Sequence, residues 1–254
     1  MLTQPTIEKL MAMKLPAMAQ AFADQMQRPD MAALCFEERF GLIVDIQATE
    51  LDNRRMQNRL RTAKLRLSAA IEDLDLRQGR GLDRATIMSL AQNQWVKHHH
   101  NILITGPTGA GKSYLACALA QKACRDGHTV LYQRLPRLLH DIAVSRLDGR
   151  YHKLIAPICK CEVLVLDDLL ISPLTREDQR ELLEIVEERY DRKATIVTSQ
   201  LPIKSWYDAM QDDPTLADAI LDRLVHNAYK LDIKGESMRR KRSSLDRKID
   251  PVTD

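Results

Sequence analysis

A stretch of eight residues has the spacing of a phosphate-binding loop. It satisfies every specified position of G-x-x-x-x-G-K-[ST] and consists of Gly106, Pro107, Thr108, Gly109, Ala110, Gly111, Lys112 and Ser113. The glycines let successive backbone N–H groups face one anion, and the helix expected to begin near Lys112 presents its positive end to the same anion. Lys112 can reach the β- and γ-phosphates of a nucleoside triphosphate, and the Ser113 hydroxyl can hold Mg²⁺. A glycine-rich turn without a ligand is the weaker alternative, because a strand is expected before the loop and a helix after it.

Two adjacent carboxylates, Asp167 and Asp168, follow an apolar run over residues 163–166 that is typical of a buried strand. A nucleoside triphosphatase needs a carboxylate for its metal and a group that orients water. Asp167 would hold Mg²⁺ through water, and Asp168 would polarise the attacking water. An acidic turn after a core strand is the alternative, but the phosphate loop in the same chain favours the catalytic interpretation.

Short apolar runs that alternate with helical segments must position these groups. The predicted strands cover residues 101–105, 129–133, 162–167, 194–199 and 229–233, and the predicted helices cover about 112–125, 135–147, 176–191 and 214–227. This alternation is typical of βαβ crossovers and of a largely parallel α/β sheet. Because a whole strand separates the two motifs in sequence, strand 194–199 is expected to lie between them in the sheet. The polar residues that end it, Thr198, Ser199 and Gln200, would then lie near the γ-phosphate.

Residues 1 to about 78 are expected to form an all-helical module, and residues 79–254 an α/β domain with a basic tail. Apolar residues recur at helical spacing through 34–67, and Pro16 suits the first turn of a helix. Residues 77–83 indicate a linker, and Asp83 could cap a short helix after it. Six basic residues between Arg54 and Arg66 are typical of a solvated helix face, but such a run could also follow a phosphate backbone.

The composition excludes several classes of protein. Apolar residues make up 44% of the 254 residues, which excludes a disordered chain, and aromatic residues make up only 4%, which argues against a β-sandwich or barrel. No window approaches the ~18 apolar residues that would span a bilayer, and a signal-peptide pattern is absent from the sequence. Five cysteines without CxxC spacing fit reduced thiols. We therefore expect a cytoplasmic protein without membrane contact.

Two further patterns resemble metal sites. Residues 98–100 are three consecutive histidines, but side chains alternate along a strand and cannot converge on one ion. A polar turn is therefore expected there. Cys159 and Cys161 lack further ligands at usable spacing and are expected to pack in the core.

These motifs, in this order, resemble the AAA+ ATPases, and specifically the clade of the replication initiator DnaA and the helicase loader DnaC. A closer resemblance, to the IstB-type transposition helper ATPases, covers nearly the whole chain, including its N-terminal helices. It is carried by MLTQPTIEKLMAMKLPAMAQAF, FEERFGLIVDIQATELDNRR, GPTGAGKSYLACALA, VLVLDDLL, ATIVTSQLP, AILDRLVHNA and GESMRRKR. The resemblance implies a P-loop AAA+ core, with a five-stranded parallel sheet sandwiched by helices, after an all-helical N-terminal module and without a C-terminal lid domain.

The resemblance also implies roles for individual residues. Residues 106–113, together with Tyr114, would bind ATP, and Lys112 would also serve catalysis. Asp167 and Asp168 would be the metal-binding and catalytic acidic pair. At the position of Asp168 most AAA+ proteins have Glu, whose side chain is longer. The shorter side chain of Asp168 is expected to affect the rate of ATP hydrolysis rather than the binding of ATP.

The remaining implied roles belong to two sensors and an arginine finger. Gln200, at a position where Asn is commoner, would sense the γ-phosphate, with Ser199 beside it. Arg223 would reach the ATP of a neighbouring subunit. Arg239 occupies the position of the second sensor arginine, whose usual role depends on a C-terminal lid domain.

Contact with duplex DNA is expected from the basic region after the second predicted strand, which in this clade lines the bore of a helical assembly. The residues expected to contact phosphates are Arg137, Arg146, Arg150 and Lys153. A solvated face is the alternative for each of them. Because aromatic residues are scarce there, binding should follow the backbone with little sequence preference.

The function implied by the resemblance is ATP- and Mg²⁺-dependent assembly of several copies on duplex DNA, which assists an IstA-type transposase in target selection and insertion. Hydrolysis of ATP would reset the assembly. A DnaC-like replicative helicase loader is the first alternative, because it has the same ATPase and a different partner. A small-molecule P-loop kinase would work as a monomer without Arg223, and a DNA-coating protein would bind ATP without hydrolysing it.

Overall fold

A computed structural model describes residues 3–76, 81–210 and 212–235 of the chain. The chain divides into two compact units, Met1–Asn58 and Arg59–Asp254. The first unit is helical over its described residues, as predicted. It contains α1 (Thr3–Ala12), α2 (Pro16–Gln27), the short 3₁₀ helix η1 (Pro29–Ala33) and most of α3 (Phe36–Ala63). The division between the units falls inside α3, earlier in the chain than the boundary expected after residue 78.

The second unit is built on a five-stranded parallel sheet with the strand order β2-β3-β4-β1-β5. Its strands are β1 (Asn101–Thr105), β2 (Val130–Arg134), β3 (Val163–Leu169), β4 (Ala194–Ser199) and β5 (Ala228–Asp232), each close to its predicted range. β4 pairs with β1 through Ile104 and Thr198, and with β3 through Leu166 and Val197. The prediction that this strand lies between the two motif strands is therefore confirmed.

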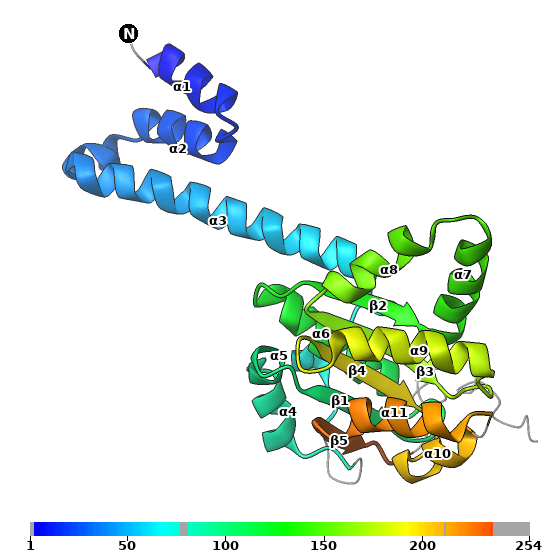
Figure 1. The fold of residues 1–254 in the computed structure, drawn as a ribbon. Helices are drawn as coiled ribbons and strands as arrows, with labels where there is room; N and C mark the ends of the chain where they lie inside the picture. The colour runs from blue at the N-terminus through cyan, green and yellow to red at the C-terminus, as the bar shows by residue number, and fades with distance from the viewer. Residues whose placement is uncertain (1–2, 77–80, 211, 236–254) are drawn as a thin grey trace, which may run out of the picture. The chain divides into compact units, whose positions relative to one another are not determined.

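Helices cover both faces of the sheet (Figure 1). One face packs against α4 (Arg84–Leu90), α5 (Gln94–Lys97) and α6 (Lys112–Arg125), and the other against α7 (Leu135–Leu147), α9 (Arg176–Arg189) and α11 (Pro214–Val225). Side chains that alternate along each strand fill the two cores in turn. In β1, for example, Ile102 and Ile104 lie in the core that contains α6, whereas Leu103 lies in the opposite one. The predicted αβα sandwich is confirmed.

Side-chain caps define where the helices of the second unit begin. The Asp83 carboxylate accepts a hydrogen bond from the Thr86 amide at the start of α4, as predicted. Thr175 and Asp178 form a capping box at the start of α9, and Asp213 caps α11. Each cap satisfies amide groups that have no partner inside the helix, which stabilises the helix by about 1 kcal/mol.

Besides η1 and α5, four short elements were not predicted from the sequence. They are η2 (Ile71–Asp73), α8 (Tyr151–Lys160), η3 (Ile203–Ser205) and α10 (Trp206–Ala209). The helical pattern of α8 is interrupted by Pro157, which removes a backbone hydrogen bond. The buried Arg189 side chain donates to the carbonyl oxygens of Ile158 and Cys161, at 2.7 and 3.0 Å, and so satisfies the C-terminal end of α8.

The three histidines lie in a turn before β1, as predicted, and Cys161 is buried in the core. Within the described ranges, no group of three or more His, Cys, Asp or Glu could hold a metal ion. None of the helices described is both long and apolar enough to cross a membrane. β5 is the last element that the structure describes. The predictions about Arg239 and about the absence of a C-terminal lid domain therefore fall on residues outside the described part of the chain.

Candidate active site

The phosphate loop connects the carboxyl end of β1 to the first turn of α6. Gly106, Gly109 and Gly111 have φ angles of 143°, 82° and 106°, which favour glycine. A Cβ atom at Gly106 would lie 2.3 Å from the carbonyl oxygen of Ile233, so the chain after β5 also requires glycine there. The amide groups of the loop and the N-terminus of α6 therefore lie together, in an arrangement suited to binding phosphates.

Lys112 and Ser113, at the start of α6, extend the loop toward the sheet. The Lys112 ammonium donates to the carbonyl oxygens of Gly106 and Pro107, at 2.8 and 2.9 Å. The Ser113 hydroxyl donates to the Asp167 carboxylate at 2.8 Å. The structure thus brings together the lysine, the hydroxyl and the first acidic residue that the sequence singled out.

Asp167 is fully buried near the carboxyl end of β3, and both of its carboxylate oxygens are hydrogen-bonded. Oδ1 accepts from Ser113 and, at 2.5 Å, from the Thr198 hydroxyl on β4. Oδ2 accepts from the Tyr132 hydroxyl on β2, also at 2.5 Å. Burial, followed by the hydrogen bond to Asp167, raises the pKa of Tyr132, which keeps this hydroxyl a proton donor.

Asp168 follows in a backbone conformation that is uncommon for a residue with a side chain. Its φ angle is 67°, and the pairing of β3 with β4 shifts register between Leu166 and Leu169. The Asp168 amide donates to the Thr198 hydroxyl at 3.1 Å, which fixes this turn. The kink directs the second carboxylate away from the sheet, and strained backbone of this kind is concentrated at functional sites.

Two arginines contact the acidic pair, and sequence reasoning missed their role. Arg134 donates to Asp168 Oδ2 at 2.7 Å, and Arg66 NH1 lies 3.6 Å from Asp167 Oδ2 and 3.9 Å from Asp168 Oδ2. Arg134 could have been found once β2 was placed beside β3, because it pairs with Asp167 in the sheet register. Arg66 carries no such signal, since it lies outside the sheet and about a hundred residues earlier in the chain.

The end of β4 brings one of its two expected sensor residues to the phosphate loop. The side-chain amide oxygen of Gln200, Oε1, accepts a hydrogen bond of 2.7 Å from the Thr108 hydroxyl in the loop. Ser199 is fully buried, and its hydroxyl donates to the carbonyl oxygen of Leu169 instead. Gln200 is therefore placed to sense a phosphate group, whereas the Ser199 side chain is turned toward β3.

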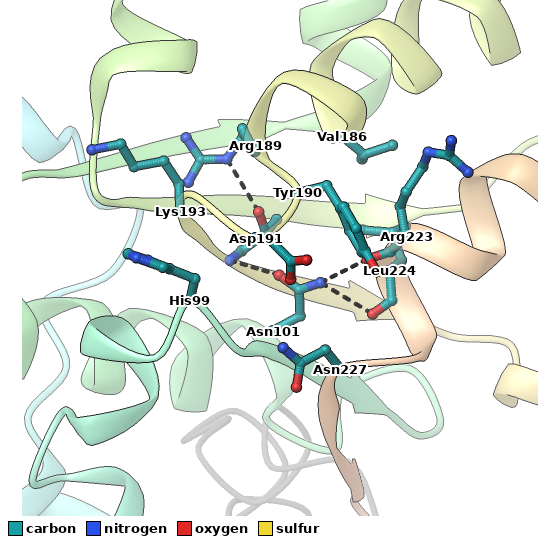
Figure 2. Close-up of a pocket in the computed structure, with 11 residues that line it drawn as sticks. His99, Asn101, Val186, Arg189, Tyr190, Asp191, Lys193, Arg223, Leu224 and Asn227 are labelled. Carbon is teal, nitrogen blue, oxygen red and sulfur yellow. Dashed lines mark hydrogen bonds between the residues drawn. The ribbon is translucent and has the colours of Figure 1, made fainter.

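Arg223 lies on α11, near Asn101 at the start of β1 (Figure 2), whereas the phosphate loop follows the other end of this strand. The Asn101 side chain, at the start of β1, donates to the backbone carbonyl oxygens of Arg223 and Leu224. At roughly 3.3 Å per residue, β1 keeps Arg223 far from the loop in the same molecule. The Arg223 guanidinium pairs with Glu187 on α9, and this hydrogen bond raises the pKa of the arginine.

The four expected DNA contacts lie on α7, on α8 and between them. Arg137 and Arg150 are mostly exposed and pair with Asp141 and Asp148. Lys153 lies exposed on α8. Arg146 differs from the other three residues, because it bonds Glu181 on α9 and its guanidinium lies 4.1 Å from the centre of the Tyr151 ring.

Comparisons with known proteins agree with this arrangement. The model of the family described as IstB-like ATP binding protein matches residues 8–246. An insertion sequence ATP-binding protein of Sinorhizobium fredii, y4pL, is 48% identical over 240 residues, which cover 94% of this chain and 98% of the relative.

Two solved structures share the fold of the second unit. The structure of DnaI has a TM-score of 0.59 and 23% identity, over 66% of this chain and 92% of DnaI. The structure of the DnaC helicase loader has a TM-score of 0.58 and 21% identity, over 68% of this chain and all of the loader. The chain therefore belongs to the family described as IstB-like ATP binding protein, and its second unit shares the fold of DnaI and of the DnaC helicase loader.

Proposed function

We propose that this protein is an ATP-dependent helper of an insertion-sequence transposase. It binds ATP with Mg²⁺, assembles as several copies on duplex DNA with little sequence preference, and assists an IstA-type transposase in target selection and insertion. The observation that carries the proposal is the separation of Arg223 from the phosphate loop by the length of β1. Because Arg223 lies away from the loop of its own molecule, an ATP site that uses this arginine is completed by another copy, so hydrolysis depends on assembly.

The residues at the end of β3 fit Mg²⁺. The Ser113 hydroxyl oxygen lies 2.8 Å from Asp167 Oδ1, and hydroxyl and carboxylate oxygens are ligands that this ion prefers. When bound, Mg²⁺ neutralises charge on the β- and γ-phosphates. Lys112 and the loop amides bind the phosphates, Gln200 orients the γ-phosphate, and Asp168 accepts a hydrogen bond from the attacking water. Their positions support these roles, because all of these groups lie near the carboxyl ends of β1, β3 and β4.

The names of the relatives favour the transposition helper over a helicase loader. The relative that is 48% identical is named as an insertion sequence ATP-binding protein, whereas the likeness to the DnaC helicase loader, at 21% identity, shows a shared fold alone. A cytoplasmic location is part of the proposal, because the transposase and the DNA substrate would be found there.

Electron microscopy of the protein with duplex DNA tests the proposal, with a non-hydrolysable ATP analogue in one sample and no nucleotide in the other. We expect ordered assemblies only with the analogue and Mg²⁺. Pull-down of an IstA-type transposase by the assembled protein, with a replicative helicase as the comparison, then tests the partner. Particles that stay monomeric on DNA with the analogue would contradict the assembly, and capture of the helicase alone would favour the loader.

A further inference from the structure

The two oxygens of the Asp167 carboxylate face different surroundings. Oδ1 faces Ser113 and the phosphate loop, where Mg²⁺ is proposed to bind. Oδ2 faces the opposite way, toward the Tyr132 hydroxyl at 2.5 Å and Arg66 NH1 at 3.6 Å. The orientation of Oδ1 toward the proposed metal site is therefore set both by the groups behind Oδ2 and by the Thr198 hydroxyl, which donates to Oδ1.

Arg66 belongs to a packed segment that precedes the sheet in sequence and places this residue beside Asp167. α3 ends at Ala63, which is fully buried, and Lys64 turns the chain with a φ angle of 52°. Ala69 and Ile71 are then buried against the α6 face of the sheet. The backbone of Arg66 also reaches the Cys117 thiol on α6. The position of Arg66 is thus set by burial on both sides of it in the chain.

Arg66, Tyr132 and Asp167 form a chain of hydrogen bonds. The guanidinium of Arg66 donates to the Tyr132 hydroxyl, and that hydroxyl donates to Asp167 Oδ2. A donor that is itself bonded by a positive charge is polarised and becomes a stronger donor. In addition, the positive charge of Arg66 attracts both carboxylates of the acidic pair, at 3.6 and 3.9 Å.

We propose that Arg66 is a positioning residue of the ATPase site, which acts through Tyr132 to fix the Asp167 carboxylate so that Oδ1 faces Ser113 and the metal. The inference rests on the proposed binding of Mg²⁺ at these two residues. Groups that orient a metal ligand from behind typically change metal affinity or activity by about 10–100-fold when they are removed. The proposal also means that the ATPase site extends to a residue before position 79.

The test compares nucleotide binding with and without the metal. We would measure the affinity of full-length protein for a fluorescent, non-hydrolysable ATP analogue in Mg²⁺ and in EDTA, without DNA. In Arg66→Ala, the gain in affinity from Mg²⁺ should fall by about ten-fold or more, while binding in EDTA stays unchanged, because Lys112 and the loop are intact. Arg66→Lys should restore part of the gain, since it keeps the charge but loses the planar donor geometry.

Arg192→Ala is the matched control, because Arg192 is an exposed arginine that pairs with Glu188 at 3.7 Å, away from the site. It should keep the full gain from Mg²⁺. If Arg66→Ala fails to fold, as judged by circular dichroism, Tyr132→Phe interrupts the same chain by losing only the hydroxyl and should lower the gain in the same way. In the double variant Arg66→Ala/Tyr132→Phe, the gain in affinity from Mg²⁺ should then be little smaller than in either single variant.

Two results would overturn the inference. One is a folded Arg66→Ala or Tyr132→Phe variant that keeps the full gain from Mg²⁺. The other is an equal loss of affinity in Mg²⁺ and in EDTA, which would mean that Arg66 supports the loop rather than the metal ligand. Failure of the proposed function looks different, because the parent protein itself would then gain nothing from Mg²⁺.

Discussion

The Asp168 carboxylate lies between two guanidinium groups, those of Arg134 and Arg66. In the proposed function, this carboxylate accepts a hydrogen bond from the attacking water. The left-handed backbone at Asp168 directs its side chain out of the sheet while Asp167 stays buried in it. The two neighbouring aspartates are thus suited to different tasks.

Asp168→Asn tests the proposed role of Asp168 in orienting the attacking water. The amide keeps the size of the side chain but loses its charge, so the variant should bind ATP and assemble normally while it hydrolyses ATP ~10²–10⁴-fold more slowly. Phosphate release in single-turnover experiments measures the rate. Turnover equal to that of the parent would show that another group positions the water.

Lys112→Ala tests the binding of phosphates at the loop. The variant should bind ATP far more weakly and should lose ATP-dependent assembly, because a positive charge next to the loop carbonyl oxygens is removed. Lys122→Ala, on the last turn of the same helix, is the control and should bind ATP normally. Isothermal titration calorimetry measures both, and near-parental binding by Lys112→Ala would contradict the site.

At the scale of elements, the C-terminal end of α9 contacts α8, β4 and α11. Its buried Arg189 donates to carbonyl oxygens at the end of α8 and at Ala194 in β4, while Glu187 on the same helix holds Arg223. Burial lowers the pKa of Arg189, yet the surrounding carbonyl oxygens satisfy the charged form. The helix therefore sets the positions of α8 and of Arg223 together.

Arg189→Ala should lower the free energy of unfolding by about 3–5 kcal/mol, because several buried carbonyl oxygens lose their partner. Arg192→Ala, three residues along the chain and exposed, should change it by less than about 1 kcal/mol. Urea unfolding followed by circular dichroism measures both changes. Equal, small effects would show that water satisfies the carbonyl oxygens in place of Arg189.

The basic side chains of α7 and α8 make a prediction about DNA binding. If Arg137 and Lys153 contact phosphates, Arg137→Ala and Lys153→Ala should each reduce the slope of log affinity against log salt by about 0.9, whatever the DNA sequence. Arg146→Ala should change the slope less, since Arg146 is engaged by Glu181 and Tyr151. Filter binding over a range of salt concentrations tests this, and unchanged slopes in the first two variants would move the DNA path elsewhere.

The sheet and its strand order could be predicted because each strand is a short apolar run and because the two motifs fix the ends of β1 and β3. α8 could not, since Pro157 interrupts its pattern. The direction of Ser199 could not either, because neighbouring residues of a strand face opposite sides and the sequence does not say which side carries the phosphates. Arg66 depends on a contact between distant parts of the chain, which no local pattern encodes.

At the scale of the whole molecule, the phosphate loop and Arg223 lie at opposite ends of β1, so one copy offers a binding site and an arginine at separate places. Arg223 is held by Glu187, with 28% of its side chain exposed, and in the proposed assembly it would exchange this partner for a phosphate of another copy. An arginine supplied in this way can contribute ~10³–10⁵ to the rate of hydrolysis. Arg223→Ala should therefore bind ATP normally and hydrolyse it slowly.

Mixing Arg223→Ala with Lys112→Ala tests most directly the central claim that each ATP site is completed by a second copy. The first variant holds ATP but lacks the arginine, and the second keeps the arginine but binds ATP weakly. Where a Lys112→Ala copy places its Arg223 at the ATP of a neighbouring Arg223→Ala copy, an intact site is formed. We predict that ATP hydrolysis of the mixture, measured over a series of ratios, exceeds that of either variant alone. A mixture with no more than the summed activity of its parts, together with parental hydrolysis by monomeric Arg223→Ala, would contradict the claim.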